Sequence, residues 1–249
     1  MIDQNTIERI ASDLGALGIQ SGDMVLVHSS LKSLGYVKGG PETVIQGLLQ
    51  AVGDDGTLLM PALSYGQEPH HIHSTRETPS NVGTIPEYFR KRAGTFRSIH
   101  PTHSVCGIGK GVPEFFKDHH LDRTPCGPNS PLNRMIDLGA KIIMLGCGLR
   151  PNTTMHALEE YEKPPYLFGG ECIYTITDWN GKTYNEKYRR HGFAGWKQRY
   201  DRVAQLTSAS FIRCGNVLEA NTYVLGTQGL RAAVLSKMRE APCFFVDRH

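Results

Sequence analysis

The sequence predicts one α/β domain over residues 1–249, with a central, mostly parallel sheet flanked by helices and an added antiparallel hairpin. Three observations predict this class. Short apolar runs bounded by turn residues recur along the chain, as expected for buried strands. Segments with helical apolar spacing lie between several of these runs, as expected when helices connect parallel strands. Late in the chain, an Asn-Gly pair is typical of a tight hairpin turn.

The N-terminal part predicts helix, strand, helix and strand in that order. Apolar residues at helical spacing predict a helix over 6–17, and a turn at 21–23 leads into a buried strand over 24–27. Pro41 opens the second helix, and a strand over 57–60 follows it. The polar stretch 65–81 has no apolar period. We interpret it as a functional or mobile loop because it is long for a mere connection.

The remaining chain repeats the strand-loop-helix pattern and then predicts the hairpin. A helix begins near Pro86, and a helix over 131–138 precedes a strand over 141–145. The hairpin strand 172–177 leads to Asn180-Gly181. Further elements are expected as helices over 153–161, 201–206 and 230–238 and strands near Phe211 and Tyr223.

Composition restricts the class of protein. With 39% hydrophobic and 20% charged residues, the chain is globular and long enough for a large core. The net charge of +3 is spread along the chain without a long run of Lys and Arg, so we expect neither nucleic-acid nor membrane-surface binding. No signal-like or membrane-spanning apolar run occurs, and the six cysteines form no CxxC pair. We therefore expect a cytoplasmic protein with reduced thiols.

A first polar cluster follows the first predicted strand. His28, Ser29, Ser30 and Leu31 come before Gly35 and a further glycine pair. Ligands of α/β sheets bind at the carboxyl ends of strands, and hydroxyls beside a helix N-terminus suit phosphate or amide groups. The alternative is a turn whose serines cap a helix, and the sequence leaves both open.

A second cluster places His100 and His103 among hydroxyl residues in segment 97–105. Two histidines suggest a metal site, but a zinc site needs three or four ligands, and neither an HExxH nor a CxxC pattern is present. The same applies to His70, His71 and His73. We therefore predict no metal.

The third cluster is the most informative. On the helix expected over 153–161, His156 and Glu159 are three residues apart and share one face. A neighbouring carboxylate orients an imidazole and stabilises its charged form, as a general base for an amine requires. Threonines at the helix start can cap it, and its amides can bind an oxyanion. An exposed ion pair is the alternative.

Taken in order, these clusters resemble the aminoglycoside 3-N-acetyltransferase family of antibiotic N-acetyltransferases. The resemblance covers roughly residues 20–165 and rests on four ordered landmarks. They are His28-Ser29-Ser30-Leu31 with the following glycines, Arg97-Ser98 with His100-Pro101 and Ser104, Ser130-Pro131-Leu132, and Thr154 with His156 and Glu159.

The resemblance implies an antibiotic-acetyltransferase fold, distinct from the GNAT fold, that binds acetyl-CoA beside a cleft for a small-molecule amine. It implies that His156 is the general base of a direct transfer, that Glu159 orients His156 or meets the ammonium, and that Thr154 places the thioester or its oxyanion. The coenzyme residues would be His28, Ser29, Ser30, Leu31, Gly35, His103, Ser104, Ser130 and Pro131. The sequence does not indicate an oligomeric state.

The acceptor is less defined. An aminoglycoside is polycationic, so its cleft should offer carboxylates. Glu159, Glu160 and Glu162 form an acidic group that Glu68 and Asp122 can extend from loops. Tyr65, Glu68 and Glu160 are our candidates for substrate contact. A non-antibiotic amine and a nucleotide-linked amino sugar remain alternative acceptors.

Two other functions remain open. Strand 141–145 leads into Gly146-Cys147-Gly148, which suggests a dinucleotide-binding oxidoreductase. That fingerprint is incomplete, because its third glycine would fall at Pro151. The non-enzyme alternative is a binding module that keeps the coenzyme site but has lost turnover, or a purely structural α/β domain.

Overall fold

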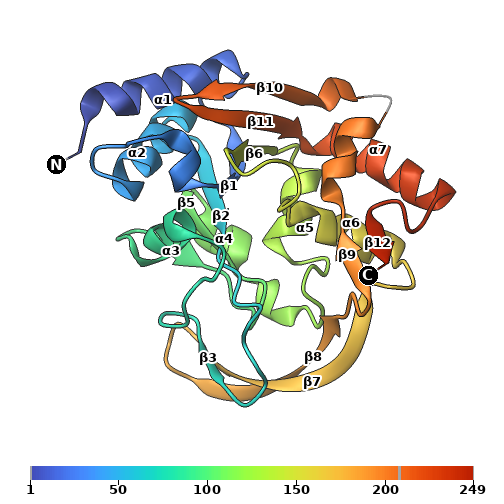
Figure 1. Ribbon diagram of the computed structural model, residues 1–249. Coiled ribbons are helices and arrows are strands. Elements are labelled where there is room, and N and C mark those ends of the chain that lie inside the picture. The colour runs from blue at the N-terminus through green and yellow to red at the C-terminus, as the bar shows by residue number, and fades with distance from the viewer. Residues whose placement is uncertain (1, 207–208, 249) are drawn as a thin grey trace.

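A computed structural model describes residues 2–206 and 209–248. A seven-stranded sheet lies between two layers of helices (Figure 1), with strand order β10-β11-β6-β1-β2-β5-β4. The strands are β1 (Met24–Ser29), β2 (Thr57–Pro61), β4 (Phe96–Arg97), β5 (Val105–Gly109), β6 (Lys141–Leu145), β10 (Ile212–Val217) and β11 (Ala220–Gly226). One face packs on α1 (Gln4–Ala16), α2 (Pro41–Val52) and α3 (Thr84–Lys91), and the other on α4 (Val112–Phe116), α5 (Pro131–Asp137), α6 (Thr154–Glu162) and α7 (Thr227–Glu240).

Successive side chains along a strand point to opposite faces of the sheet, so each central strand contributes to the hydrophobic cores on both faces. Val25 and Val27 of β1 point into the core under α1 and α2, whereas Leu26 points into the core under α5 to α7. All three are fully buried. A strand covered on both faces is apolar throughout, which is why β1 and β6 are continuous apolar runs in the sequence.

The predicted α/β class is confirmed, and the strand directions add detail. Parallel pairing joins β6, β1 and β2, the three strands at the centre of the sheet. The outer strands β11, β10, β5 and β4 pair antiparallel. For two of these pairs the reason is the length of the connection: β10 and β11 are joined by two residues and β4 and β5 by the short loop 98–104, and such short connections join antiparallel neighbours.

The predicted hairpin is β7 (Phe168–Thr177) with β8 (Thr183–His191), and it curves away from the main sheet (Figure 1). The turn lies at Asn180-Gly181, with Gly181 at φ +80°. The loop predicted over 65–81 contributes strand β3 (Ile72–Ser74), which pairs with β7. A hairpin and a loop about 100 residues apart thus form one small sheet.

The C-terminal region differs locally from the prediction. The helix expected over 201–206 is a 3-10 helix, η3 (Tyr200–Gln205), held by short-range bonds such as Leu206 N to Val203 O. In the sequence, η3 follows β9 (Trp196–Gln198) and precedes β10 and β11. Strand β9 pairs antiparallel with β12 (Val246–Arg248), near the C-terminal end of the chain.

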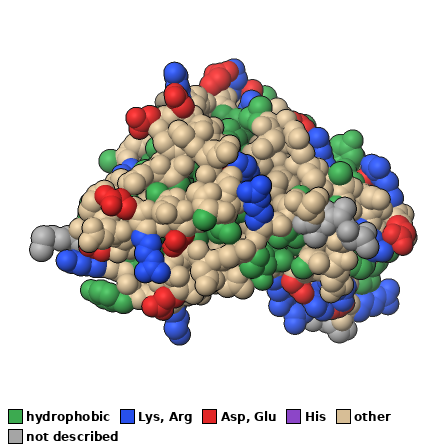
Figure 2. Space-filling view, turned by 90° about the horizontal axis from the view of Figure 1, so that it is seen from above, with side chains coloured by type: hydrophobic (Ala, Val, Ile, Leu, Met, Phe, Trp, Pro, Cys, Tyr) green, Lys and Arg blue, Asp and Glu red, His purple; other side chains and the backbone are tan. Residues whose placement is uncertain are grey.

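Charged side chains of both signs are mixed on the face over α1, β10 and β11. Lys, Arg, Asp and Glu are interspersed there, with no continuous field of one sign on that face (Figure 2). Among the helices of residues 2–206 and 209–248, none has the length and apolarity needed to cross a bilayer.

Candidate active site

A cleft of about 990 Å³ opens beside the carboxyl ends of β2 and β6. Its walls come from the segment after β2, from the β6–α6 turn, and from the ends of β7 and β8. His156 and Tyr200 contribute to the lining. The location agrees with the general position of ligand sites in α/β sheets.

His156 and Glu159 form the pair expected from their spacing. Nδ1 of His156 lies 3.1 Å from Oε2 of Glu159, and the Glu159 carboxylate is completely buried. Because an ionised carboxylate only accepts, Nδ1–H of His156 donates to it, which leaves Nε2 as the acceptor nitrogen. Nε2 has no hydrogen-bond partner within the described residues, and His156 lines the cleft. An imidazole held in this way can accept a proton through Nε2.

Two tyrosines that the sequence analysis missed hold Glu159 in place. Tyr200 donates to Oε2 at 2.7 Å, and Tyr166 donates to Oε1 at 3.0 Å. Burial and then Glu159 raise the pKa of both phenols, so both stay neutral donors. Neither tyrosine carries a local signal, because each reaches Glu159 from outside α6.

Asn152, a residue of the cleft lining, has a side-chain donor that none of the described residues satisfies. Its side chain is fully buried, and its Oδ1 accepts from Thr154 N at 3.1 Å. This fixes the amide orientation. Nδ2 then has no partner in the described part of the chain, although Asn152 lines the cleft. An unsatisfied buried donor is costly, which marks Nδ2 as a donor for a ligand.

The start of α6 differs from the expectation that its threonines and amides act on a ligand. Thr153, the N-cap, makes no side-chain cap bond, and Asn152 takes that role. The amides of Met155 and His156 already bond to backbone carbonyls. Thr153 lines the cleft, whereas Thr154 is fully buried and does not. A catalytic role for Thr154 stays a prediction.

A second histidine-glutamate pair faces the first. Nε2 of His191, at the end of β8, lies 2.8 Å from Oε1 of Glu160, which also accepts from Cys126 N at 2.6 Å. The rings of His191 and His156 have centroids 5.1 Å apart. Burial, with His156 next, lowers the pKa of His191 well below its usual value. His191 is therefore neutral. The sequence analysis missed it because it belongs to no recognisable sequence motif and meets Glu160 only in the folded chain.

The other histidines near the cleft make separate polar contacts. His103 lines the cleft, and its Nδ1 lies 2.9 Å from Thr102 Oγ1. Burial lowers the pKa of His28 to about 3, and Nε2 of His28 is 3.5 Å from Thr153 Oγ1. Over residues 2–206 and 209–248, no three His, Cys, Asp or Glu side chains gather in a way that can hold a metal ion.

The structure brings one of the nine predicted coenzyme residues, His103, to the cleft lining. Ser130 caps α5 by accepting from Leu132 N at 3.3 Å. Ser104 accepts from Arg97 Nε at 2.7 Å and donates to Ala62 O. The members outside the lining are His28, Ser29, Ser30, Leu31, Gly35, Ser104, Ser130 and Pro131. Their contact with a coenzyme stays a prediction.

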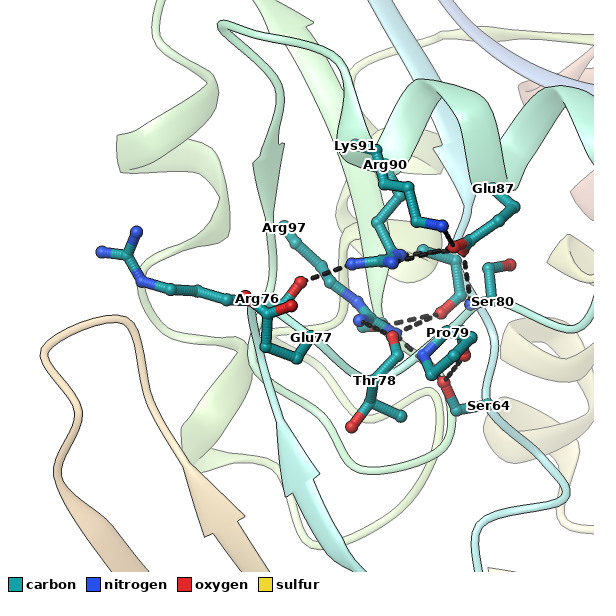
Figure 3. Close-up of polar contacts among 12 residues, drawn as sticks. Ser64, Arg76, Glu77, Thr78, Pro79, Ser80, Glu87, Arg90, Lys91 and Arg97 are labelled. Carbon is teal, nitrogen blue, oxygen red and sulfur yellow. Dashed lines mark hydrogen bonds and ion pairs between the residues drawn. The ribbon is translucent and has the colours of Figure 1, made fainter.

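Arg97, a landmark of the second cluster, lies in a network of polar contacts with the segment after β2 (Figure 3). Its side chain is buried, with the residue 2% exposed, and its guanidinium donates to Ala62 O at 2.8 Å, Ser64 Oγ at 3.0 Å and Thr78 O at 2.6 Å. Burial lowers its pKa to about 10, which leaves it charged. Arg97 therefore ties both ends of the segment that carries Tyr65 and Glu68.

The predicted substrate residues are divided between cleft and interior. Tyr65 and Glu68 line the cleft, and Tyr65 is 64% exposed. Glu160 lies behind His191, outside the lining. Of the other acidic candidates, Asp122 accepts from Asn129, and Glu162 pairs with Arg239.

Comparison with known proteins reveals clear relatives. The family model described as Aminoglycoside 3-N-acetyltransferase matches residues 26–241. The chain is 35% identical over 199 residues to aminoglycoside N(3)-acetyltransferase VII of Streptomyces paromomycinus, covering 68% of each chain. It is 34% identical over 176 residues to type VIII of Streptomyces fradiae, covering 63% of this chain and 61% of that one. The matched part is thus about two thirds of these relatives' length.

Solved structures share the whole fold. Aminoglycoside acetyltransferase AAC(3)-Xa superposes with a TM-score of 0.83 at 27% identity, covering 94% of this chain and 92% of that chain. AAC-IIIb, solved as a binary complex with CoASH, has a TM-score of 0.81 at 25% identity, covering 93% and 95%. A variant of AAC(3)-IVa in complex with a gentamicin has 0.82 at 27%, covering 95% and 89%.

Proposed function

The chain belongs to the aminoglycoside 3-N-acetyltransferase family, and we propose that it transfers the acetyl group of acetyl-CoA directly to an amine of an aminoglycoside or related amino sugar. Membership confirms the predicted family and the prediction of an acyltransferase enzyme. The observation that carries the proposal is the oriented His156, whose free Nε2 belongs to a ring lining the cleft.

His156 removes the proton that blocks attack. A sugar amine is largely protonated at neutral pH and must lose one proton to become a nucleophile. Nε2 of His156 accepts that proton, and the buried Glu159 carboxylate stabilises the imidazolium. The amine nitrogen then bonds to the thioester carbon, the carbon–sulfur bond breaks, and the departing thiolate takes the second nitrogen-bound proton. The products are the N-acetyl amine and CoA thiol.

Asn152 stabilises the charge that develops during attack. The thioester oxygen becomes negative in the tetrahedral intermediate and needs a fixed donor. Asn152 Nδ2 is such a donor, because the Thr154 amide already holds its other side-chain atom. One donor of this kind contributes roughly 100-fold to 1000-fold in kcat.

The cysteine in the cleft supports direct transfer over an acetyl-enzyme. Cys147 lines the cleft, and burial raises the pKa of its thiol to about 12. The thiolate is the nucleophilic form of cysteine, so a thiol with this pKa attacks poorly near neutral pH. The acetyl group therefore passes to the acceptor in one step.

Acetyl-CoA fits the cleft by size and chemistry. The related AAC-IIIb was solved with CoASH, and the turn after β6 here carries Arg150 and Asn152 at the carboxyl end of a strand. Phosphate groups bind such positions in α/β sheets. We place the coenzyme phosphates at this turn and the acceptor opposite, beside β8. Cytoplasmic location and action as one domain over 1–249 belong to the same proposal.

The test is thiol release from acetyl-CoA against a panel of aminoglycosides and simpler amino sugars. Acceptor-dependent release is expected, and His156→Ala should lower kcat by about two to four powers of ten while the dissociation constant of acetyl-CoA stays unchanged. Near-normal kcat in His156→Ala removes His156 from the role. No release with any acceptor, despite coenzyme binding, contradicts the proposal and favours a binding module.

A further inference from the structure

We propose that the acceptor carries a phosphate group beside its reacting amine and that Arg190 binds this phosphate. The inference rests on the proposed acetyl transfer and deepens it by defining the acceptor class. It follows from the charges that the cleft leaves unpaired.

Two of the carboxylates that we expected to bind a polycation, those of Glu159 and Glu160, accept hydrogen bonds from other groups of the protein instead. Glu159 accepts from His156, Tyr166 and Tyr200. Glu160 accepts from Thr124 at 2.5 Å as well as from Cys126 N and His191. Neither lines the cleft, which leaves Glu68 as the carboxylate among the lining residues. One exposed carboxylate is a weak site for a molecule with several ammonium groups.

The two arginines at the cleft form no ion pair with a carboxylate of the described residues. Arg150 and Arg190 both line it and are exposed. Arg150 donates from Nε to Gln198 O at 3.1 Å, and within the described residues no carboxylate lies in ion-pair range of either guanidinium. Most arginines elsewhere pair with a carboxylate, for example Arg92 with Glu42 and Arg123 with Glu186. The cleft is therefore prepared for anions.

Arg190 lies on the wall of the cleft where we place the acceptor. It belongs to β8, as does His191, which also lines the cleft and whose ring lies 5.1 Å from that of His156, the proposed base. Arg150 lies instead in the turn after β6, where the coenzyme phosphates are proposed. The two arginines thus serve two different anions, one on each substrate.

A phosphate is the anion that suits this site. The planar guanidinium donates two parallel hydrogen bonds to phosphate oxygens. The exposed Tyr65 lines the same cleft and offers aromatic surface for a sugar ring or a base, whereas Tyr174, which also lines it, is buried. The acceptor class is therefore an amino sugar phosphate, either a monoester or a nucleoside-diphosphate-linked sugar.

The test compares matched acceptors that differ in the anion: glucosamine, glucosamine 6-phosphate, UDP-glucosamine and gentamicin. We expect kcat/KM to be at least about tenfold higher for one of the two phosphorylated amines than for glucosamine and gentamicin. The more active phosphorylated amine identifies the source of the phosphate. Acetyl transfer with a preference for gentamicin or glucosamine overturns the inference and leaves the proposed function intact, whereas no transfer to any amine contradicts both.

Arg190→Gln tests the residue, with Arg189→Gln as the matched control. Arg189 is its neighbour on β8, stacks on Phe168 at 4.3 Å and does not line the cleft. Arg190→Gln should remove the roughly tenfold advantage of the phosphorylated amine and leave KM for acetyl-CoA unchanged, while Arg189→Gln keeps the advantage. A raised KM for acetyl-CoA with unchanged acceptor preference overturns the assignment, because Arg190 then binds the coenzyme.

Discussion

Tyr200 and Glu159 are joined by a 2.7 Å hydrogen bond across 41 residues of sequence, and this bond orients the base of the proposed reaction. Tyr200 begins η3 and Glu159 lies on α6. The phenol donates to the same carboxylate oxygen, Oε2, that receives Nδ1–H of His156. The position of His156 therefore depends on a residue outside its own helix.

Tyr200→Phe should lower kcat about tenfold, because Glu159 loses one of its three donors while the ring volume is kept. The dissociation constant of acetyl-CoA should not change. Steady-state kinetics over a pH series checks this, since a displaced base also changes the pH profile of kcat/KM. Tyr166→Phe, which removes the bond to the other oxygen, is the comparison. Unchanged kcat and pH profile in Tyr200→Phe would show that Glu159 orients His156 without this phenol.

Asn152→Asp separates the two functions of the Asn152 side chain. Aspartate keeps an oxygen for the Thr154 amide but lacks the Nδ2 donor. We expect kcat to fall roughly 100-fold to 1000-fold in both Asn152→Asp and Asn152→Ala. If Asn152→Asp retains wild-type kcat and only Asn152→Ala is slow, Asn152 is a helix cap and not an oxyanion donor.

Arg97→Met should destabilise the protein by about 1–3 kcal/mol, since it leaves Thr78 O without its side-chain donor and removes one of the two side-chain donors to Ala62 O, which keeps only Ser104. Urea unfolding measures the change. Arg76→Met is the control, because Arg76 is exposed and bonds one carbonyl, Trp179 O. A loss below about 1 kcal/mol would contradict the buried network shown in Figure 3.

Acid should unfold the protein early. Burial lowers the pKa of His28, His73 and His119 to about 3, against the ordinary value of 6.5 that applies when unfolded. Between these values the unfolded chain binds protons that the folded chain does not. Their contribution to stability is therefore complete above pH 6.5 and is lost as the pH falls towards 3. Each histidine contributes a slope of about 1.4 kcal/mol per pH unit.

His73→Leu checks this with one group. His73 is fully buried, and neither ring nitrogen has a hydrogen-bond partner among the described residues. Urea unfolding at about pH 7.5, 6.0 and 5.0 should show a slope smaller by about one proton in the variant. An identical slope in both proteins would mean that His73 is protonated, or exposed, in the folded state.

Metal chelation should not change the rate. The proposed steps use His156 and Asn152 and need no Lewis acid. Acetyl transfer is measured before and after prolonged incubation with EDTA, with added Zn²⁺ as a further arm. Loss of activity that Zn²⁺ restores would contradict the prediction of a metal-free site.

Sequence periodicity predicted most elements well because their signals are local. The strand expected over 141–145 is β6 with the same bounds, and Pro41 begins α2 as predicted. The pairing of His156 with Glu159 was also predictable, since residues three apart on a helix are neighbours. The antiparallel outer strands were not, because direction depends on how distant segments are connected.

The sequence by itself determined most of the elements, the family landmarks and the contact between His156 and Glu159, because each depends on residues close together in the chain. Tertiary structure alone decided which carboxylates remain free. Glu159, Glu160 and Glu68 look alike in the sequence, but the first two are buried under donors from Tyr166, Tyr200, Cys126 and His191, whereas Glu68 lines the cleft. Those donors approach from separate elements, and no local spacing encodes contacts across such distances. The charge that a substrate meets is therefore a property of the fold.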